Sequence, residues 1–291
     1  MRGRSHKEVR QRLSGSCAQL YLLCFCFISI FSPLASRLTP HAQASEPLVI
    51  AASPSVAAPV EALSRHFEAT HPDVRVKVYY DTGLSLRQTI ATVENRGPYF
   101  IGTGPIHLLA PGGDELIARL QQKYYVLPGT TVTYASVPLV LVVPESLVDA
   151  PSSFEAAARD SQIRIAIADP SLTALGQETV RVLKSMGLAQ AVIERLDIAA
   201  DAAGVLDHLL NGKADVAIVF GPDAARESRR VRVVAVASDE VSPAKIHSMV
   251  MERSCPDRAL CHEFLASIQG PGAQALLKTL GYGPPPSGAT K

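Results

Sequence analysis

After residue 44, two kinds of apolar pattern alternate along the chain. Short apolar or alternating runs predict strands at 48–52, 74–78, 99–103, 137–143, 163–168, 216–220 and 231–237. Apolar residues at helical spacing predict helices at 55–67, 86–93, 115–122, 176–186, 201–210, 259–268 and 273–280. This alternation predicts an α/β protein with mainly parallel sheets. Residues 284–291 read as a disordered tail.

The first 44 residues have the pattern of an export signal. Residues 2–12 are basic, residues 20–31 are apolar, and Ala42-Gln43-Ala44 has the small-x-small form that signal peptidase cuts. We therefore expect a signal peptide over 1–44, cleavage near Ala44 and a mature protein in the periplasm. An uncleaved N-terminal anchor is the alternative.

Composition limits the classes of function. The chain has 291 residues, of which 47% are hydrophobic and 19% charged, which is too apolar for a disordered protein. After residue 44 there are 22 basic and 26 acidic residues, so the body is mildly acidic. We therefore expect no nucleic-acid partner, because non-specific nucleic-acid binding needs a basic surface.

Two cysteines, Cys255 and Cys261, remain after the leader. In an oxidising compartment such a pair predicts one disulfide, and two buried free thiols are the alternative. The sequence gives weaker support for a metal site, since Cys261 and the adjacent His262 lack a second spaced pair of ligands.

The sequence contains none of the common catalytic signatures that we sought. There is no G-x-S-x-G elbow, no G-x-x-x-x-G-K-[ST] phosphate loop and no H-E-x-x-H. Asp169 at a strand end could serve a hydrolase, but a turn or cap aspartate is the simpler interpretation. We expect a protein that is not an enzyme.

One device recurs where apolar strands end. A Ser, Thr or Asp follows the strand and a helix begins at once, at Ser53 or Ser55, Thr82, Ser171 or Thr173, and Asp201. Helix N-termini present unpaired N–H groups and a partial positive charge, so several that converge can bind an anion without Lys or Arg. The alternative is that each residue is an ordinary helix cap.

Five segments, in order, resemble a known family. They are VIAASPSVAAPVEAL, DTGLSLRQTI, RIAIADPSLTALG, ADAAGVLDHLLNGKADVAIVFGPDA and QGPGAQALLKTLGY. Together, over residues 47–283, they resemble the periplasmic molybdate-binding proteins of ABC transporters. The resemblance implies a two-lobed type II periplasmic binding fold, each lobe a mainly parallel sheet flanked by helices. Residues 45–134 and 241–291 would form lobe I and residues 135–240 lobe II, with the ligand held between the lobes.

The resemblance also implies the ligand contacts. Ser53 and Thr82 would each give a hydroxyl and a backbone N–H, and Leu175 and Ala202 a backbone N–H each. Phe220 stands where the family has a tyrosine, and a phenyl ring cannot donate a hydrogen bond. A second departure lies at PYFIGTGP, which lacks the two acids of the family's corresponding segment.

The expected function follows from this resemblance. The protein would capture a tetrahedral oxyanion, molybdate or tungstate, for the permease of an ABC importer, as a monomer and with no cofactor or metal beyond the bound ion. Two alternatives stay open: a binding protein for another anion such as sulfate or a phosphonate, which Phe220 favours, and a sensor module without a role in transport.

Overall fold

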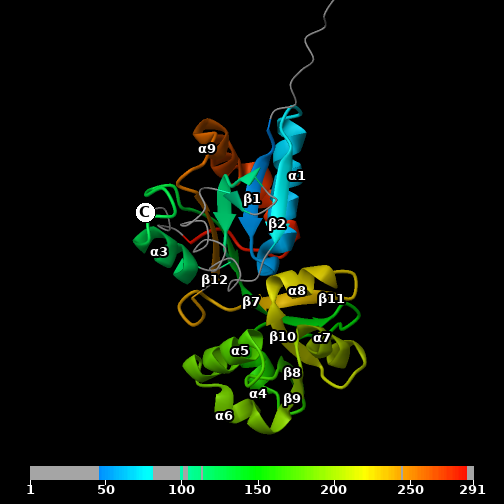
Figure 1. Ribbon diagram of the computed structural model, residues 1–291. Coiled ribbons are helices and arrows are strands. Elements are labelled where there is room, and N and C mark those ends of the chain that lie inside the picture. Colours follow the sequence, from blue (N-terminus) through cyan, green and yellow to red (C-terminus); the bar gives the residue numbers. More distant parts are fainter. Residues whose placement is uncertain (1–45, 81–98, 101–103, 113, 244, 287–291) are drawn as a thin grey trace, which may run out of the picture. The chain divides into compact units, whose positions relative to one another are not determined.

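A computed structural model describes residues 46–80, 99–100, 104–112, 114–243 and 245–286 (Figure 1). The strands are β1 Leu48–Ala52, β2 Val76–Tyr80, β3 Tyr99–Phe100, β4 Gly104–Pro105, β5 Leu108–Ala110, β6 Val132–Val137, β7 Leu139–Pro144, β8 Ile165–Ala168, β9 Leu196–Ala199, β10 Val216–Phe220, β11 Val231–Val236 and β12 Lys245–Met251. The helices are α1 Ala57–Thr70, α3 Asp114–Gln122, α4 Phe154–Arg159, α5 Ala174–Ser185, α6 Ala189–Val192, α7 Ala202–Leu210, α8 Gly221–Arg226, α9 Arg258–Ser267 and α10 Pro271–Thr279. Two short 3₁₀ turns, η1 Pro54–Val56 and η2 Ile193–Arg195, precede α1 and β9.

The first sheet has the strand order β2-β1-β5-β12-β6. β1 is wholly buried and pairs in parallel with both β2 and β5. α1 packs on this sheet through Val60, Leu63 and Phe67, and the Phe67 ring meets Phe264 of α9 edge-on at 5.0 Å between centroids. Burial of this apolar face is the main force that holds α1 on the sheet.

The second sheet has the order β11-β7-β10-β8-β9. β10, β8 and β9 run parallel, and β7 is antiparallel to β10. Val205 and Leu209 of α7 and Val182 of α5 pack into its core. Figure 1 shows α5 and α7 on either side of these strands. The carboxyl ends of β10, β8 and β9 therefore lie along one edge of the sheet.

The chain changes sheet at a single residue, Pro138. β6 ends at Val137 in the first sheet and β7 begins at Leu139 in the second. The chain returns to the first sheet between Val236 and Lys245. The boundary that we expected after residue 134 therefore falls inside β6.

The predicted fold class is confirmed, and several predicted elements are corrected. The strand expected over 137–143 is β7, which begins only at Leu139, because Pro138 has no N–H to continue a ladder and Val137 ends the separate strand β6. The turn expected at Gly221-Pro222 starts α8, since proline is tolerated in the first turn of a helix. Periodicity did not predict β4, β5, β6, β9, β12, α4 or α6. The helix expected at 86–93, residues 101–103 of the strand expected at 99–103, and residues 287–291 of the tail lie outside the described residues.

Among the helices of the described part of the chain, none combines the length and apolar character needed to cross a membrane.

Candidate functional site

Three of the residues that the resemblance assigned to ligand contact lie along one edge of the second sheet. Phe220 ends β10, Leu175 is in the first turn of α5 after β8, and Ala202 opens α7 after β9. Because these three strands are parallel neighbours, their following loops are adjacent, and the Asp169 N–H donates to the Ala199 carbonyl oxygen at 2.8 Å. Ligands of open α/β sheets bind at such carboxyl ends.

The start of α5 leaves an N–H group open. Thr173 caps the helix, with its hydroxyl accepting from the Gly176 N–H at 2.9 Å. No described residue accepts a hydrogen bond from the N–H of Leu175. Gly176 allows the helix to start close against β8, because a Cβ there would lie 2.3 Å from the Ala168 carbonyl oxygen. The open N–H is therefore held at the end of β8.

The start of α7 repeats this arrangement. The Asp201 carboxylate accepts from the Gly204 N–H at 2.9 Å and caps the helix. No acceptor for the Ala202 N–H exists among the described residues. Ala202 is half-buried at one end of a cavity of about 340 Å³ between α7 and α8. The helix starts that follow two neighbouring strands thus each offer free N–H donors, among them the two that the resemblance assigns to the ligand.

Asp169 is part of a turn. Its carboxylate accepts from the Ser171 hydroxyl at 2.6 Å and from the Ser171 N–H at 2.7 Å. These hydrogen bonds hold the pKa of Asp169 below its ordinary value. A carboxylate that is already bonded and acidic is a poor general base at neutral pH, which weakens the hydrolase alternative.

The Phe220 ring has a cation beside it. The ring is half-buried against the core of the second sheet, and the Lys245 Nζ lies 5.2 Å from its centroid. Lys245 is the first residue of β12 and pairs with Val137. The sequence analysis gave Lys245 no role, because it did not predict β12.

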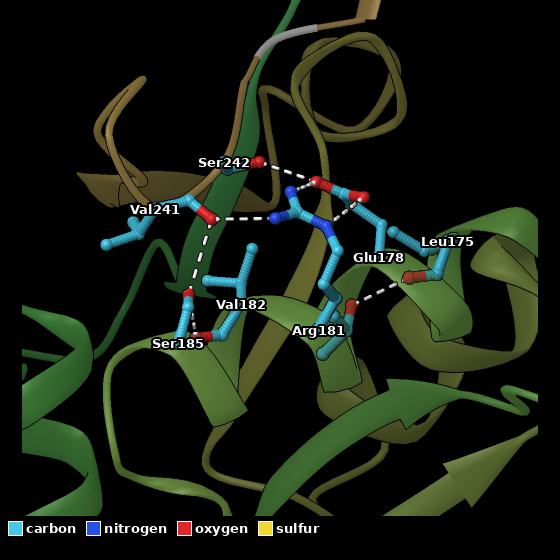
Figure 2. A network of polar contacts seen from close by, with 8 residues as sticks. Leu175, Glu178, Arg181, Val182, Ser185, Val241 and Ser242 are labelled. Carbon is cyan, nitrogen blue, oxygen red and sulfur yellow. Dashed lines mark hydrogen bonds and ion pairs between the residues drawn. The ribbon is translucent and has the colours of Figure 1, made fainter.

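A polar network ties α5 to the segment that returns to the first sheet (Figure 2). The Glu178 carboxylate accepts from the Arg181 Nε at 3.1 Å and from the Ser242 hydroxyl at 2.7 Å, while the Arg181 Nη1 donates to the Val241 carbonyl oxygen at 3.1 Å. Burial alone would raise the pKa of Glu178. Hydrogen bonds from Arg181 and Ser242, with the attraction of Arg181 and Lys245, bring that pKa below its ordinary value. Sequence periodicity offered no signal for this network, since its partners are far apart in the chain.

Ser53 lies at the carboxyl end of β1 in the first sheet and is buried. Its N–H donates to the Ala110 carbonyl oxygen at 2.9 Å, and its hydroxyl contacts the Ser55 hydroxyl at 2.9 Å. The N–H expected to meet the ligand is therefore already bonded, and the hydroxyl is the group that could reorient toward one. Thr82, two residues beyond β2, lies outside the described residues.

Cys255 and Cys261 are buried free thiols whose sulfur atoms lie 2.6 Å apart. The hydrogen bond between the two sulfurs and their burial raise the pKa of Cys261, which keeps it a thiol. The disulfide itself stays a prediction. Within the described part of the chain, no cluster of His, Cys, Asp and Glu could hold a metal ion.

Comparison with known proteins places this geometry in a family. The model of the bacterial extracellular solute-binding proteins matches residues 48–283. Among solved structures, a protein described as the substrate-binding domain of a molybdenum ABC transporter from Clostridium difficile is 19% identical with a TM-score of 0.71; the match covers 82% of this chain and 99% of that one.

Two further structures show the same fold. The periplasmic molybdate-binding protein of Azotobacter vinelandii is 21% identical with a TM-score of 0.53, over 82% of this chain and 100% of that one. Iron-bound HitA of Pseudomonas aeruginosa is 14% identical with a TM-score of 0.54, over 83% of this chain and 88% of that one. The fold thus serves solutes of different chemistry. Because the family model spans residues 48–283 of the 291, the protein belongs to the bacterial extracellular solute-binding proteins, which work with the permeases of ABC importers.

Proposed function

We propose that this solute-binding protein captures a fully deprotonated tetrahedral oxyanion, molybdate or tungstate, and presents it to the permease of an ABC importer. The observation that supports this best is the pair of open N–H groups at Leu175 and Ala202. They stand at the starts of two helices that follow neighbouring parallel strands. Helix N-termini are favourable sites for anions.

The donor chemistry of the site narrows the ligand class. The groups left for the ligand are the hydroxyl of Ser53, the N–H groups of Leu175 and Ala202, and the hydroxyl and N–H that the resemblance assigns to Thr82. A dianion without protons only accepts hydrogen bonds, so such a site suits it. A protonated phosphate is penalised because its own O–H would have no acceptor.

We propose that the ion is captured by closure of two lobes, one built on each sheet. The chain crosses between the sheets twice, so two lobes can close on one ion and exclude water, as in hinged binding proteins. The closed, loaded form would then be the one that the permease recognises.

We also propose that residues 1–44 are a signal peptide cut near Ala44. The mature protein would act in the periplasm as a monomer without a cofactor. In that compartment Cys255 and Cys261 would form a disulfide. Mass spectrometry of the exported protein tests the first and last points. A mature N-terminus at Ser45 and a mass two hydrogens below that of the reduced chain are expected.

Calorimetric titration tests the ligand. Purified protein is titrated with molybdate, tungstate, sulfate, phosphate and a phosphonate, and with ferric iron because an iron-bound protein shares the fold. Molybdate or tungstate should bind most tightly. Heat with sulfate or a phosphonate alone would favour the second candidate, which Phe220 supports because the family tyrosine is missing. Heat with iron alone, or with none of these solutes, would refute the oxyanion proposal.

A further inference from the structure

We propose that Lys245 is a ligand-binding residue of the anion site and supplies the hydrogen bond and the charge that Phe220 cannot. This inference rests on the proposed function, and it adds a charged specificity determinant on β12 to the uncharged donors already assigned to the ligand.

The backbone places Lys245 beside Phe220 from a different sheet. Lys245 pairs with Val137 at the start of β12, and the next residue, Pro138, accepts the Gly221 N–H at 2.9 Å through its carbonyl oxygen. The first residue of β12 and the end of β10 thus flank the same crossing. This explains why the Lys245 Nζ lies 5.2 Å from the centre of the Phe220 ring.

The ammonium of Lys245 has capacity for a ligand. The side chain is exposed, and no described residue forms an ion pair or a hydrogen bond with it. The nearest acid in its field, Glu178, already accepts from Arg181 and Ser242. The Phe220 ring holds the ammonium by a cation–π contact, which uses none of its three N–H donors.

The charges of the cluster favour an anion. Lys245 and Arg181 carry two positive charges against the negative charge of Glu178, and the Asp223 carboxylate, which accepts from the Phe220 N–H, is paired with Arg226. The local excess lies next to the carboxyl end of β10, within a body that is acidic after residue 44. A lysine is a compact point charge that attracts an oxyanion in any orientation, whereas a tyrosine hydroxyl adds a donor without charge. The site therefore remains donor-only and gains an affinity for dianions that depends on salt.

The experiment measures molybdate affinity by calorimetry for the wild-type protein and for Lys245→Met, Lys245→Arg and the control Lys213→Met. Lys213 is an exposed lysine in the turn before β10, at the opposite end of the strand that carries Phe220. Methionine keeps most of the stem and removes the charge. We expect Lys245→Met to weaken binding roughly tenfold or more, as for loss of a hydrogen bond to a charged group, and to reduce the salt dependence of the affinity. Lys245→Arg should retain most of the affinity, and Lys213→Met should match the wild type.

A double-mutant cycle separates ligand contact from support of the fold. Phe220→Tyr should improve affinity more in the Lys245→Met background than in the wild type, because the two groups substitute for each other. Unfolding without ligand shows whether each variant is folded. A folded Lys245→Met protein with wild-type affinity would overturn this inference and leave the oxyanion proposal standing. A wild-type protein that binds none of the oxyanions would overturn both.

Discussion

Glycine occupies the third position of both helices whose N–H groups are assigned to the ligand. At Gly176 a Cβ would lie 2.3 Å from the Ala168 carbonyl oxygen, a backbone atom that cannot move aside. At Gly204 a Cβ would meet side-chain atoms alone, the Ala199 Cβ at 3.2 Å and the Asp201 Oδ1 at 3.6 Å. The two positions look alike in the sequence but differ in their need for glycine.

The matched substitutions test this difference. Gly176→Ala should lower the free energy of unfolding by about 1–3 kcal/mol, the usual cost of overpacking. Gly204→Ala should change it by less than about 1 kcal/mol, because the gain in helix propensity offsets the mild contact. Urea denaturation gives both values. Equal stability of the two variants would contradict the role given to Gly176.

A second residue-scale prediction concerns Glu252, just after β12. Burial raises its pKa from an ordinary 4.5 to about 7, although N–H groups of Ser254 and Arg253 favour the charged form. Between these two values the folded state keeps a proton that the unfolded state has lost, so stability falls as the pH rises from about 4.5 to 7.

The Glu252→Gln variant should lose this dependence. Relative to this variant, we expect the wild-type protein to lose roughly 1–2 kcal/mol across that pH range, since partial exposure reduces the full linkage value. Denaturation midpoints at pH 4.5, 5.5 and 7 measure the slope, and the exposed Glu240→Gln serves as control. Equal pH slopes for the wild-type protein and Glu252→Gln would refute the assignment.

At the scale of elements, the helix starts are the parts of the site that the structure describes best. Ala202 is the first residue of α7, where proline fits the helix and removes only the N–H. Ala174 is the first residue of α5, and the resemblance assigns its N–H no ligand contact.

Ala202→Pro should therefore weaken molybdate binding by about 1.5–3 kcal/mol, the usual value of a hydrogen bond to a charged group. Ala174→Pro should leave most of the affinity. Titration calorimetry compares the two, with unfolding curves to confirm that both fold. If Ala202→Pro keeps wild-type affinity, the Ala202 N–H does not contact the ligand.

Sequence patterns predicted the elements that bury one clear apolar face. β1, β10, α7 and α10 appear where the periodicity put them. β12 was missed because His247 and Ser248, polar in the sequence, are buried in the sheet. Long-range contacts such as those of Lys245 and Glu178 depend on how strands are ordered in a sheet, which local periodicity does not record. The helix starts of the site could be predicted from the sequence, because a helix cap depends on residues that are close together in the chain.

At the scale of the whole molecule, two glycines allow close backbone contact between elements that flank different sheets. A Cβ on Gly221, at the start of α8, would lie 2.2 Å from the Gly281 carbonyl oxygen beyond α10. Gly281 has a φ of 82°, a conformation that favours glycine. This backbone contact lies next to Phe220, so packing between the elements is coupled to the candidate site.

Gly221→Ala should therefore lower both stability and ligand affinity. We expect a loss of more than about 1 kcal/mol in the free energy of unfolding, because backbone atoms must separate. A weaker response to molybdate in thermal unfolding should accompany it. The Gly204→Ala variant is the control, and a Gly221→Ala protein with wild-type stability would show that the contact is dispensable.

In the polar network between α5 and the segment that returns to the first sheet, Arg181 and Ser185 donate to the main-chain carbonyl oxygen of Val241. The side chain of the neighbouring residue can therefore be replaced without loss of these hydrogen bonds. Glu240 is exposed, and the chain contains no tryptophan. An indole introduced at position 240 would be the sole long-wavelength emitter of the molecule. Since α5 carries a proposed ligand contact in its first turn, the emission wavelength of this indole would shift when the protein binds its solute. Fluorescence would then report the fraction of the protein that is loaded.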